Sequence, residues 1–384
     1  MNEPTIEQTI NRAIQYDKFS LNLSNYNLIE IPSSILKIKN LECLYLSNNN
    51  ITIIPDFILD LPKLKILDLN KNKLKSLPDS SLLTNLESLD IGYNEIEKLP
   101  DLTGLTNLRK LNISGNKLKS LPDLSLLTNL ESLDISYNEI EKSLDLNRLT
   151  NLKKLNISRN KLKSLPDLSL LTNLESLDVS YNEIEKLLDL NRLTNLNELY
   201  INNNRIKSLP DLSGLTNLRK LDISHNRIKK LPDSIGKLKK LEELKANNNF
   251  LKTLPNSFQN LKTIYSLDLS NNKFKYIPPP IKYLFNLKCL YINNNNIKLI
   301  PRWICSLINL HILSLNNNQI QYLPQIIPNL IASKNLYKLD LSNNLIMNIP
   351  DKLLEIKYKR NELIIINNLI NLDQKIIPKY IKYY

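Results

Sequence analysis

One phrase recurs along this chain and constrains its fold more than any other feature: L-x-x-L-x-L-x-x-N-x-L, present about sixteen times. Successive copies lie 22 or 23 residues apart, with steps of 26 and 24 at the end. A fixed period of this length is typical of a solenoid in which each repeat packs only against its neighbours. The first copy has Tyr26 in place of the asparagine, which in the later copies is Asn49, Asn72, Asn94, Asn116, Asn138, Asn160, Asn182, Asn204, Asn226, Asn249, Asn272, Asn295, Asn318, Asn344 and Asn368.

Each copy predicts a short strand followed by a turn. In the copy that begins at Leu86, Leu89 and Ile91 alternate with Ser88 and Asp90, which is the pattern of a strand with one buried face. The segment that returns to the next copy is too short for a helix, so we expect a turn or a 3₁₀ stretch. One repeat cannot bury its leucines alone, and stacking therefore builds a continuous core beneath a parallel sheet.

The asparagine of each copy follows the strand, where the chain bends inward. A buried amide without hydrogen-bond partners costs about 1–3 kcal/mol, so we assign these asparagines a structural role and no binding role. Proline stands six residues later in thirteen copies, but Leu144 and Leu188 replace it in two, which predicts a different turn there.

The central repeats carry opposite charges in alternation. Residues 87–218 contain three near-copies of a 44-residue pair of repeats, which indicates tandem duplication of two repeats. Because adjacent repeats lie ~5 Å apart, each basic pair should lie beside an acidic pair, and we interpret this row as a solvated rim that keeps the repeats in register. The alternating pairs are Lys73/Lys75, Glu95/Glu97, Lys117/Lys119, Glu139/Glu141, Lys161/Lys163, Glu183/Glu185 and Arg205/Lys207.

Net charge is divided unevenly along the chain. Residues 1–190 contain 22 Lys and Arg against 26 Asp and Glu, whereas residues 191–384 contain 29 against 12. Such an excess can attract nucleic acid, anionic membrane or an acidic protein. Lysine enrichment through the codon bias of an AT-rich genome is the alternative, and it stays open. The candidate basic patch comprises Arg205, Lys207, Arg227, Lys229, Lys230 and Lys273.

Polar strand residues between the core leucines are expected to face the concave side. Tyrosine combines a large apolar area with a hydrogen-bonding tip and is enriched at binding hot spots. Duplication alone would also copy one neutral tyrosine three times, so both explanations stand. The candidate partner-binding residues on this face are Tyr93, Asp134, Tyr137, Asp178, Tyr181 and Tyr200.

The ends of the chain and its cysteines favour a reducing compartment. Ile6, Ile10 and Ile14 recur at helical spacing, which predicts a short helix over residues 5–16 that covers the first repeat. Cys43 and Cys289 occupy equivalent strand positions eleven repeats apart, so no disulfide framework is expected. The N-terminus lacks the pattern of a secretory signal, and no apolar run reaches the ~18 residues of a membrane span. We expect a cytoplasmic protein.

Signatures of catalysis and metal binding are absent. His225 and His311 lie far apart in the stack, and the five glycines form no phosphate-binding loop. No serine or cysteine stands in a nucleophile context, and the carboxylates form rows rather than an isolated pair. We therefore predict no catalytic, cofactor-binding or metal-binding residues and no enzymatic activity.

Residues 18–370 resemble the leucine-rich repeat family. The 23-residue copies, such as residues 231–241, resemble its intracellular Ras-binding and scaffold class. The 22-residue copies with Leu-Thr-Asn-Leu resemble a regulatory subunit of protein phosphatase 1 and the bacterial internalins. The Asn-, Ile- and Lys-rich style resembles proteins of giant amoeba-infecting DNA viruses or low-GC protists. A viral origin would place this chain in the host cytoplasm.

This resemblance implies an α/β solenoid, a curved leucine-rich repeat horseshoe with a parallel concave sheet and a convex side of turns or 3₁₀ stretches. It also implies that the asparagines bond to the backbone of adjacent repeats as a ladder. We divide the chain into an N-terminal capping helix (1–17), the solenoid (18–370) and a basic C-terminal tail or cap (371–384).

Two functions from different classes follow. The first is a non-catalytic scaffold, monomeric and without a cofactor, that binds an unidentified protein partner on its concave face. The second is an electrostatic binder of nucleic acid or anionic membrane through the basic C-terminal half.

Overall fold

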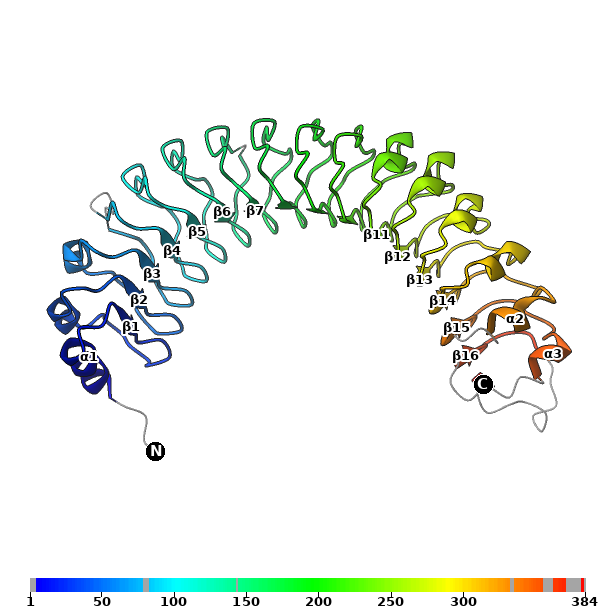
Figure 1. Cartoon of the computed structure of the whole chain (residues 1–384), viewed down its shortest axis with the longest axis horizontal. Helices are drawn as coiled ribbons and strands as arrows, with labels where there is room; N and C mark the ends of the chain where they lie inside the picture. Colours follow the sequence, from blue (N-terminus) through cyan, green and yellow to red (C-terminus); the bar gives the residue numbers. More distant parts are fainter. Residues whose placement is uncertain are drawn as a thin grey trace. The chain divides into compact units, whose positions relative to one another are not determined.

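The structure, a computed structural model, describes residues 5–78, 83–142, 144–331, 335–354, 362–370 and 381–382. The chain forms two compact units, unit 1 (Met1–Ile184) and unit 2 (Glu185–Tyr384). Within each unit the strands line the inner, concave side of the curve, and the turns and short helices lie on the outer side (Figure 1).

Unit 1 begins with one helix and continues as a stack of three-residue strands. Each strand pairs in parallel with the next one along the chain. Two 3₁₀ helices lie on the outer side of the first repeats. The elements in order are α1 (Ile6–Gln15), β1 (Ser20–Asn22), η1 (Ser33–Lys37), β2 (Cys43–Tyr45), η2 (Asp56–Asp60), β3 (Ile66–Asp68), β4 (Ser88–Asp90), β5 (Lys110–Asn112), β6 (Ser132–Asp134), β7 (Lys154–Asn156) and β8 (Ser176–Asp178).

Unit 2 continues the same architecture with more helical connections. Its strands also pair in parallel in sequence order. The elements are β9 (Glu198–Tyr200), β10 (Lys220–Asp222), η3 (Asp233–Lys237), β11 (Glu243–Lys245), η4 (Asn256–Asn260), β12 (Ser266–Asp268), η5 (Pro279–Tyr283), β13 (Cys289–Tyr291), η6 (Arg302–Ser306), β14 (Ile312–Ser314), α2 (Ile327–Ile331), β15 (Lys338–Asp340), α3 (Asp351–Leu354), β16 (Glu362–Ile364) and β17 (Ile381–Lys382).

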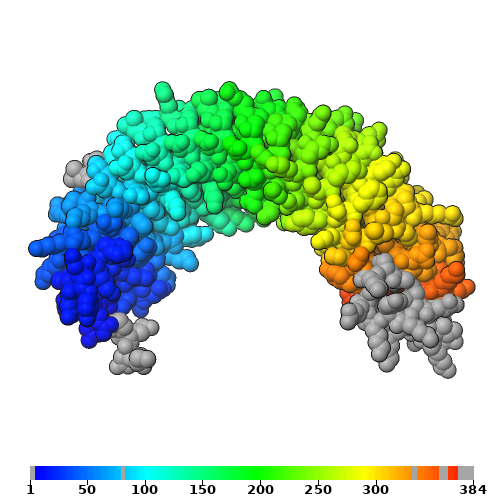
Figure 2. Space-filling model, in the orientation of Figure 1, coloured from blue at the N-terminus to red at the C-terminus, as the bar shows by residue number. Residues whose placement is uncertain are grey.

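The core of each unit is a column of apolar side chains behind the sheet. In the repeat that contains β6, Leu130, Leu133 and Ile135 are each at most 1% exposed, whereas Ser132 and Asp134 remain half-buried on the concave side. On the face seen in Figure 2, the side chains of successive repeats lie in continuous contact along each unit. The predicted period-2 strands and parallel solenoid are therefore confirmed.

Repeat length decides the form of the outer connection. Repeats of 22 residues cross the outer side in simple turns, whereas the 23-residue repeats of both units form five-residue 3₁₀ helices such as η4. Both forms were predicted. Near the C-terminus, α2 and α3 are instead short α-helices, because the longer spacing there leaves room for a wider turn.

The asparagines form the ladder that the resemblance implies. Asn138, 7% exposed, donates from its amide nitrogen to the carbonyls of Ile113 (3.0 Å) and Ile135 (3.1 Å). Its amide oxygen accepts the backbone N–H of Leu118 at 3.0 Å. One side chain thus bonds to its own repeat and to the preceding one, and this arrangement recurs down each unit.

The N-terminal helix closes the first repeat. Thr5 and Gln8 form a reciprocal capping box, and Ile10 and Ala13 are buried. The Tyr26 hydroxyl lies 3.0 Å from the Thr9 hydroxyl, so the residue that replaces the first ladder asparagine joins the repeat to α1. The predicted helix over residues 5–16 spans Ile6–Gln15, whereas most of the predicted tail, residues 371–380 and 383–384, lies outside the described residues.

Candidate functional site

The exit turn of each strand positions the tyrosines of unit 1. In the turns after β4, β6 and β8 the last strand residue is an aspartate whose carboxylate accepts the N–H two residues later, at 2.9 Å each. The following residue then adopts a left-handed backbone, with φ of +52° at Tyr93 and +53° at Tyr137 and Tyr181. These tyrosines therefore lie in the exit turns and not on the sheet itself, where the sequence pattern had placed them.

Four side chains in this turn column form a continuous row, which we name the aromatic ridge: Tyr93, Tyr137, Arg159 and Tyr181. The Tyr93 and Tyr137 rings lie 6.4 Å apart between centroids, tilted by 44°. The guanidinium carbon of Arg159 lies 4.8 Å from the centroid of the Tyr137 ring and 3.8 Å from that of Tyr181. The three tyrosines remain 48%, 47% and 42% exposed in chain order.

Asp134 and Asp178 already have structural roles. Both accept the exit-turn N–H bond described above, and the second carboxylate oxygen of Asp134 also accepts the side-chain amide of Asn156 at 3.2 Å. These hydrogen bonds fix the exit turns, and the side chains of the aromatic ridge extend from the same turns. Burial raises the pKa of Asp68, an equivalent residue in the same column.

The six predicted binding residues do not form one described group. Tyr93, Asp134, Tyr137, Asp178 and Tyr181 belong to unit 1. Tyr200 ends β9 in unit 2, where it pairs in register with Asp222 of β10. The candidate surface is therefore described as the ridge of unit 1, with Tyr200 as a separate position.

The residue missing from the sequence prediction is Arg159. It occupies the same column as the tyrosines, one position before a ladder asparagine, and its backbone is also left-handed, with φ of +52°. The prediction took only the aromatic members of this column. The signal for Arg159 in the sequence is its position, 22 residues from both Tyr137 and Tyr181 in the same column.

The alternating charges pair as predicted along one rim of unit 1. The ammonium group of Lys117 lies 3.6 Å from the Glu95 carboxylate, and that of Lys161 lies 3.1 Å from Glu139. The hydrogen bond and charge of Lys161 lower the pKa of Glu139. Each of the four side chains keeps at least 43% of its surface in solvent, so each pair contributes little to stability.

A second charged row, which the sequence prediction missed, borders the opposite end of the strands. Glu131 accepts from Arg109 at 2.9 Å and from Lys153 at 2.8 Å, and Lys65 pairs with Glu42 at 2.8 Å. These residues immediately precede the strands, and their repeat spacing was present in the sequence. The ridge and the concave strands of unit 1 thus lie between two rows of paired charges.

The six residues of the predicted basic patch are all exposed and all lie in unit 2. Lys207 forms an ion pair with Glu185 at 3.0 Å, so part of the positive charge is offset locally. Within the described part of the chain, no ion pair involves Arg227, Lys229, Lys230 or Lys273.

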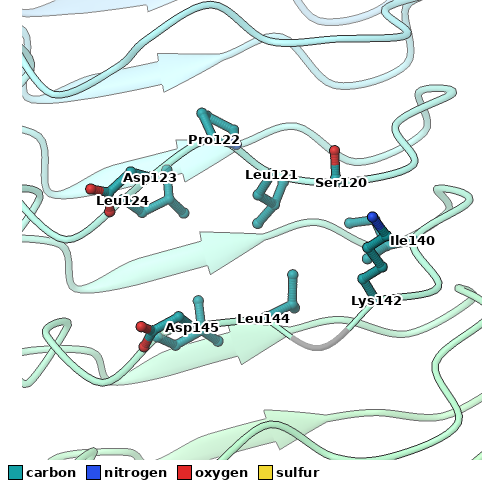
Figure 3. A pocket seen from close by; sticks show the side chains of 10 residues that line it. Ser120, Leu121, Pro122, Asp123, Leu124, Ile140, Lys142, Leu144 and Asp145 are labelled. Atoms are coloured by element: carbon teal, nitrogen blue, oxygen red, sulfur yellow. The ribbon is translucent and has the colours of Figure 1, made fainter.

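One cavity of about 350 Å³ opens between two repeats of unit 1. Figure 3 shows Leu121, Leu124, Ile140 and Leu144 around it, with Lys142 at one end. Within the sequence segment that lines the cavity, position 143 carries serine where the equivalent positions of neighbouring repeats carry leucine. Residue 143 itself lies outside the described residues.

The predicted irregular turns differ from each other. Leu144 is only 8% exposed, whereas Leu188, the other proline replacement, is 45% exposed and follows the buried Leu187. The buried leucine of the two turns therefore differs, being Leu144 in one and Leu187 in the other.

The described residues contain neither a helix that could cross a membrane nor a cluster of metal ligands. None of their helices has the length and apolar character required to span a membrane. No group of three or more His, Cys, Asp or Glu side chains is placed to hold a metal ion there.

Models of one repeat class match most of the chain. A leucine-rich repeat region model matches residues 19–208. A leucine-rich repeat model matches residues 216–274, a two-copy model matches 194–236, and a single-repeat model matches 286–307. Comparison with curated protein sequences gave no match.

Solved structures of several organisms share the fold. A leucine-rich repeat protein of Leptospira interrogans has 30% sequence identity and a TM-score of 0.67, and the match covers 84% of this chain and 95% of that one. The functional domain of InlJ from Listeria monocytogenes, at 24% identity and a TM-score of 0.70, is similar in fold; the match covers 92% of this chain and 68% of that domain.

A plant receptor is similar over part of its length. The ectodomain of the membrane receptor kinase GASSHO1/SCHENGEN3 from Arabidopsis thaliana, solved in complex with CASPARIAN STRIP INTEGRITY FACTOR 2, has 28% identity and a TM-score of 0.68. That match covers 91% of this chain but only 47% of the ectodomain, so this chain spans about half the length of that relative.

Proposed function

This chain belongs to the leucine-rich repeat family, and from that premise we propose that it is a non-catalytic scaffold that binds a protein partner on its concave side. Members of this family are typically interaction domains, and the plant receptor ectodomain was solved with a bound partner. We also propose that the protein acts as a monomer in the cytoplasm, which is the host cytoplasm if its origin is viral.

The aromatic ridge is the observation that carries this proposal. Its three tyrosines each leave more than two-fifths of their surface open, and an arginine is held among them. Tyrosine and arginine dominate the binding energy of protein interfaces, because they bury large areas and also form hydrogen bonds. Exposed tyrosines held in backbone turns lose little conformational freedom on binding, which favours affinity.

The test is affinity capture from a eukaryotic lysate treated with nuclease, at two salt concentrations. We expect discrete proteins captured by the wild type to be lost, by tenfold or more, with the variant Tyr93→Ala/Tyr137→Ala/Tyr181→Ala. The matched control is Leu126→Ala/Leu170→Ala, which removes side chains of 53% and 46% exposure from outer turns of the same unit. Equal capture by the tyrosine variant and the wild type would refute the concave scaffold.

The second candidate is an electrostatic binder of nucleic acid or anionic membrane. Four exposed basic residues support it, since Arg227, Lys229, Lys230 and Lys273 form no ion pair among the described residues. Captured nucleic acid or lipid that is released at the higher salt would favour this function over the scaffold.

A further inference from the structure

Arg159 differs from the paired cations around it in how it is held. Arg109 and Lys161 of the same unit pair with the carboxylates of Glu131 and Glu139. Arg159 instead lies between two aromatic faces, those of Tyr137 and Tyr181. Among the residues that the structure describes, none accepts a hydrogen bond from its guanidinium group. The N–H donors of the guanidinium are therefore left for another molecule.

The stacking also fixes the group before binding. Arginine ordinarily loses rotamer freedom when it forms an ion pair, and a guanidinium already held in place avoids much of this cost. Its backbone is fixed as well, because the Arg159 N–H donates to the Ser180 carbonyl at 2.9 Å. The side chain is exposed, so its N–H donors are accessible to a partner.

We propose that Arg159, held between Tyr137 and Tyr181, anchors an aspartate or glutamate side chain of the protein partner. The planar fork of N–H donors matches a carboxylate in a two-bond arrangement, which is the strong form of this contact. The flanking tyrosines exclude water and favour an acidic residue with apolar neighbours in the partner. This inference rests on the proposed function, since it names the chemistry of the partner at the same ridge.

Local charge favours a carboxylate over a doubly charged phosphate. Asp134 and Asp178 lie on the strands next to the Arg159 repeat, and Glu139 lies on the rim beside Lys161. A monoanion meets less repulsion from these carboxylates than a dianion does.

The chain contains its own version of the ridge without the cation. Gly115 occupies the equivalent position between Tyr93 and Tyr137, one 44-residue period earlier. The Tyr93 ring leans over this glycine, and a Cβ added there would lie 2.8 Å from the ring. Arg159→Gly therefore recreates an arrangement that the same fold already accommodates. Lys71, with φ of +54°, shows that lysine is accommodated in the same turn.

The experiment selects binders from a displayed library of random dodecapeptides with the full chain as bait. Among the selected peptides, those whose binding is weakened by ridge variants should carry Asp or Glu at one position more often than the unselected library does. Changing that Glu to Gln should weaken binding about tenfold, and Arg159→Gly or Arg159→Gln should weaken binding of the original peptide equally. In the Arg159→Gly protein, the Glu-to-Gln change should then have no further effect, because the two groups act as one pair.

Two control variants separate pairing from a general loss of the ridge. Tyr93→Ala removes a ring of equal exposure that does not contact Arg159, so the double-mutant coupling should persist. Tyr137→Ala removes one of the two rings that stack on Arg159 and should reduce the coupling.

Each other outcome has a definite meaning. Binding that depends on the tyrosines but shows no coupling to Arg159 overturns this inference and leaves the scaffold function standing. A library that yields no binder sensitive to any ridge variant overturns both. Selected peptides without an acidic position also overturn the inference.

Discussion

At the scale of single residues, one backbone conformation explains both the exposed side chains of the ridge and the buried asparagines of the ladder. The residue before each ladder asparagine is left-handed, including Tyr137 and Arg159, although bulky side chains rarely adopt this conformation. The cost is of order 1–2 kcal/mol per residue. It is offset because the turn brings the asparagine into the core, where the side chain of Asn138 forms four hydrogen bonds. The same turn therefore sets both the exposed position before the asparagine, which carries the aromatic ridge, and the buried position of the asparagine itself.

Removing one ladder amide should destabilise the protein far more than removing an exposed one. We expect Asn138→Ala to lower the free energy of unfolding by about 3 kcal/mol, since it leaves buried backbone groups without partners. Asn151→Ala, which removes an exposed bond to the Thr128 carbonyl, should cost less than about 1 kcal/mol. Urea unfolding followed by circular dichroism measures both; equal losses would contradict the role assigned to the ladder.

At the scale of elements, the sequence predicted strands and connections because each depends on neighbouring positions only. The alternation around Leu89 defines β4, and the extra residue of the 23-residue repeats gives 3₁₀ helices such as η4. The ridge was predicted only in part. Stacking of Arg159 on Tyr137 and Tyr181 joins residues of three repeats, and its geometry depends on side-chain directions that periodicity does not specify.

The cavity between repeats provides a test at this scale. Leu121, Ile140 and Leu144 line this cavity. Ser143→Leu gives this repeat the leucine that the equivalent positions of neighbouring repeats carry, and should raise the free energy of unfolding by about 1–2 kcal/mol. The reverse change at the equivalent position, Leu187→Ser, removes a side chain that is 3% exposed and should cost about 3 kcal/mol. Differential scanning calorimetry would show the opposite shifts in Tm. A lower Tm for Ser143→Leu would contradict this account of the cavity.

At the scale of the whole molecule, charge is divided between the two units. Unit 1 contains 21 Lys and Arg against 24 Asp and Glu, a net charge of −3, and unit 2 contains 30 against 14, a net charge of +16. A difference of this size acts on charged partners over about a Debye length, ~8 Å at physiological salt. Polyanions should therefore be attracted to unit 2.

Salt dependence tests this division. We expect a single-stranded oligothymidine to bind at low salt with an affinity that falls steeply as salt increases. The variant Arg227→Glu/Lys229→Glu/Lys273→Glu should reduce the slope and the affinity, whereas Lys119→Glu/Lys163→Glu in unit 1 should change neither. Fluorescence anisotropy at several salt concentrations measures both quantities. An affinity independent of salt would exclude unit 2 as an electrostatic binding surface.

The alternating rim charges also restrict how such a chain can lengthen over evolution. Lys117 contacts Glu95 and Lys161 contacts Glu139, so basic and acidic repeats alternate in this part of the chain. Insertion of a single 22-residue copy would place two rows of like charge side by side, whereas insertion of a 44-residue pair preserves the order. The parity of an insertion therefore changes its cost, by about 0.2–1 kcal/mol for each exposed charge pair. Selection on parity would favour growth of the array in pairs, as its three near-identical pairs display.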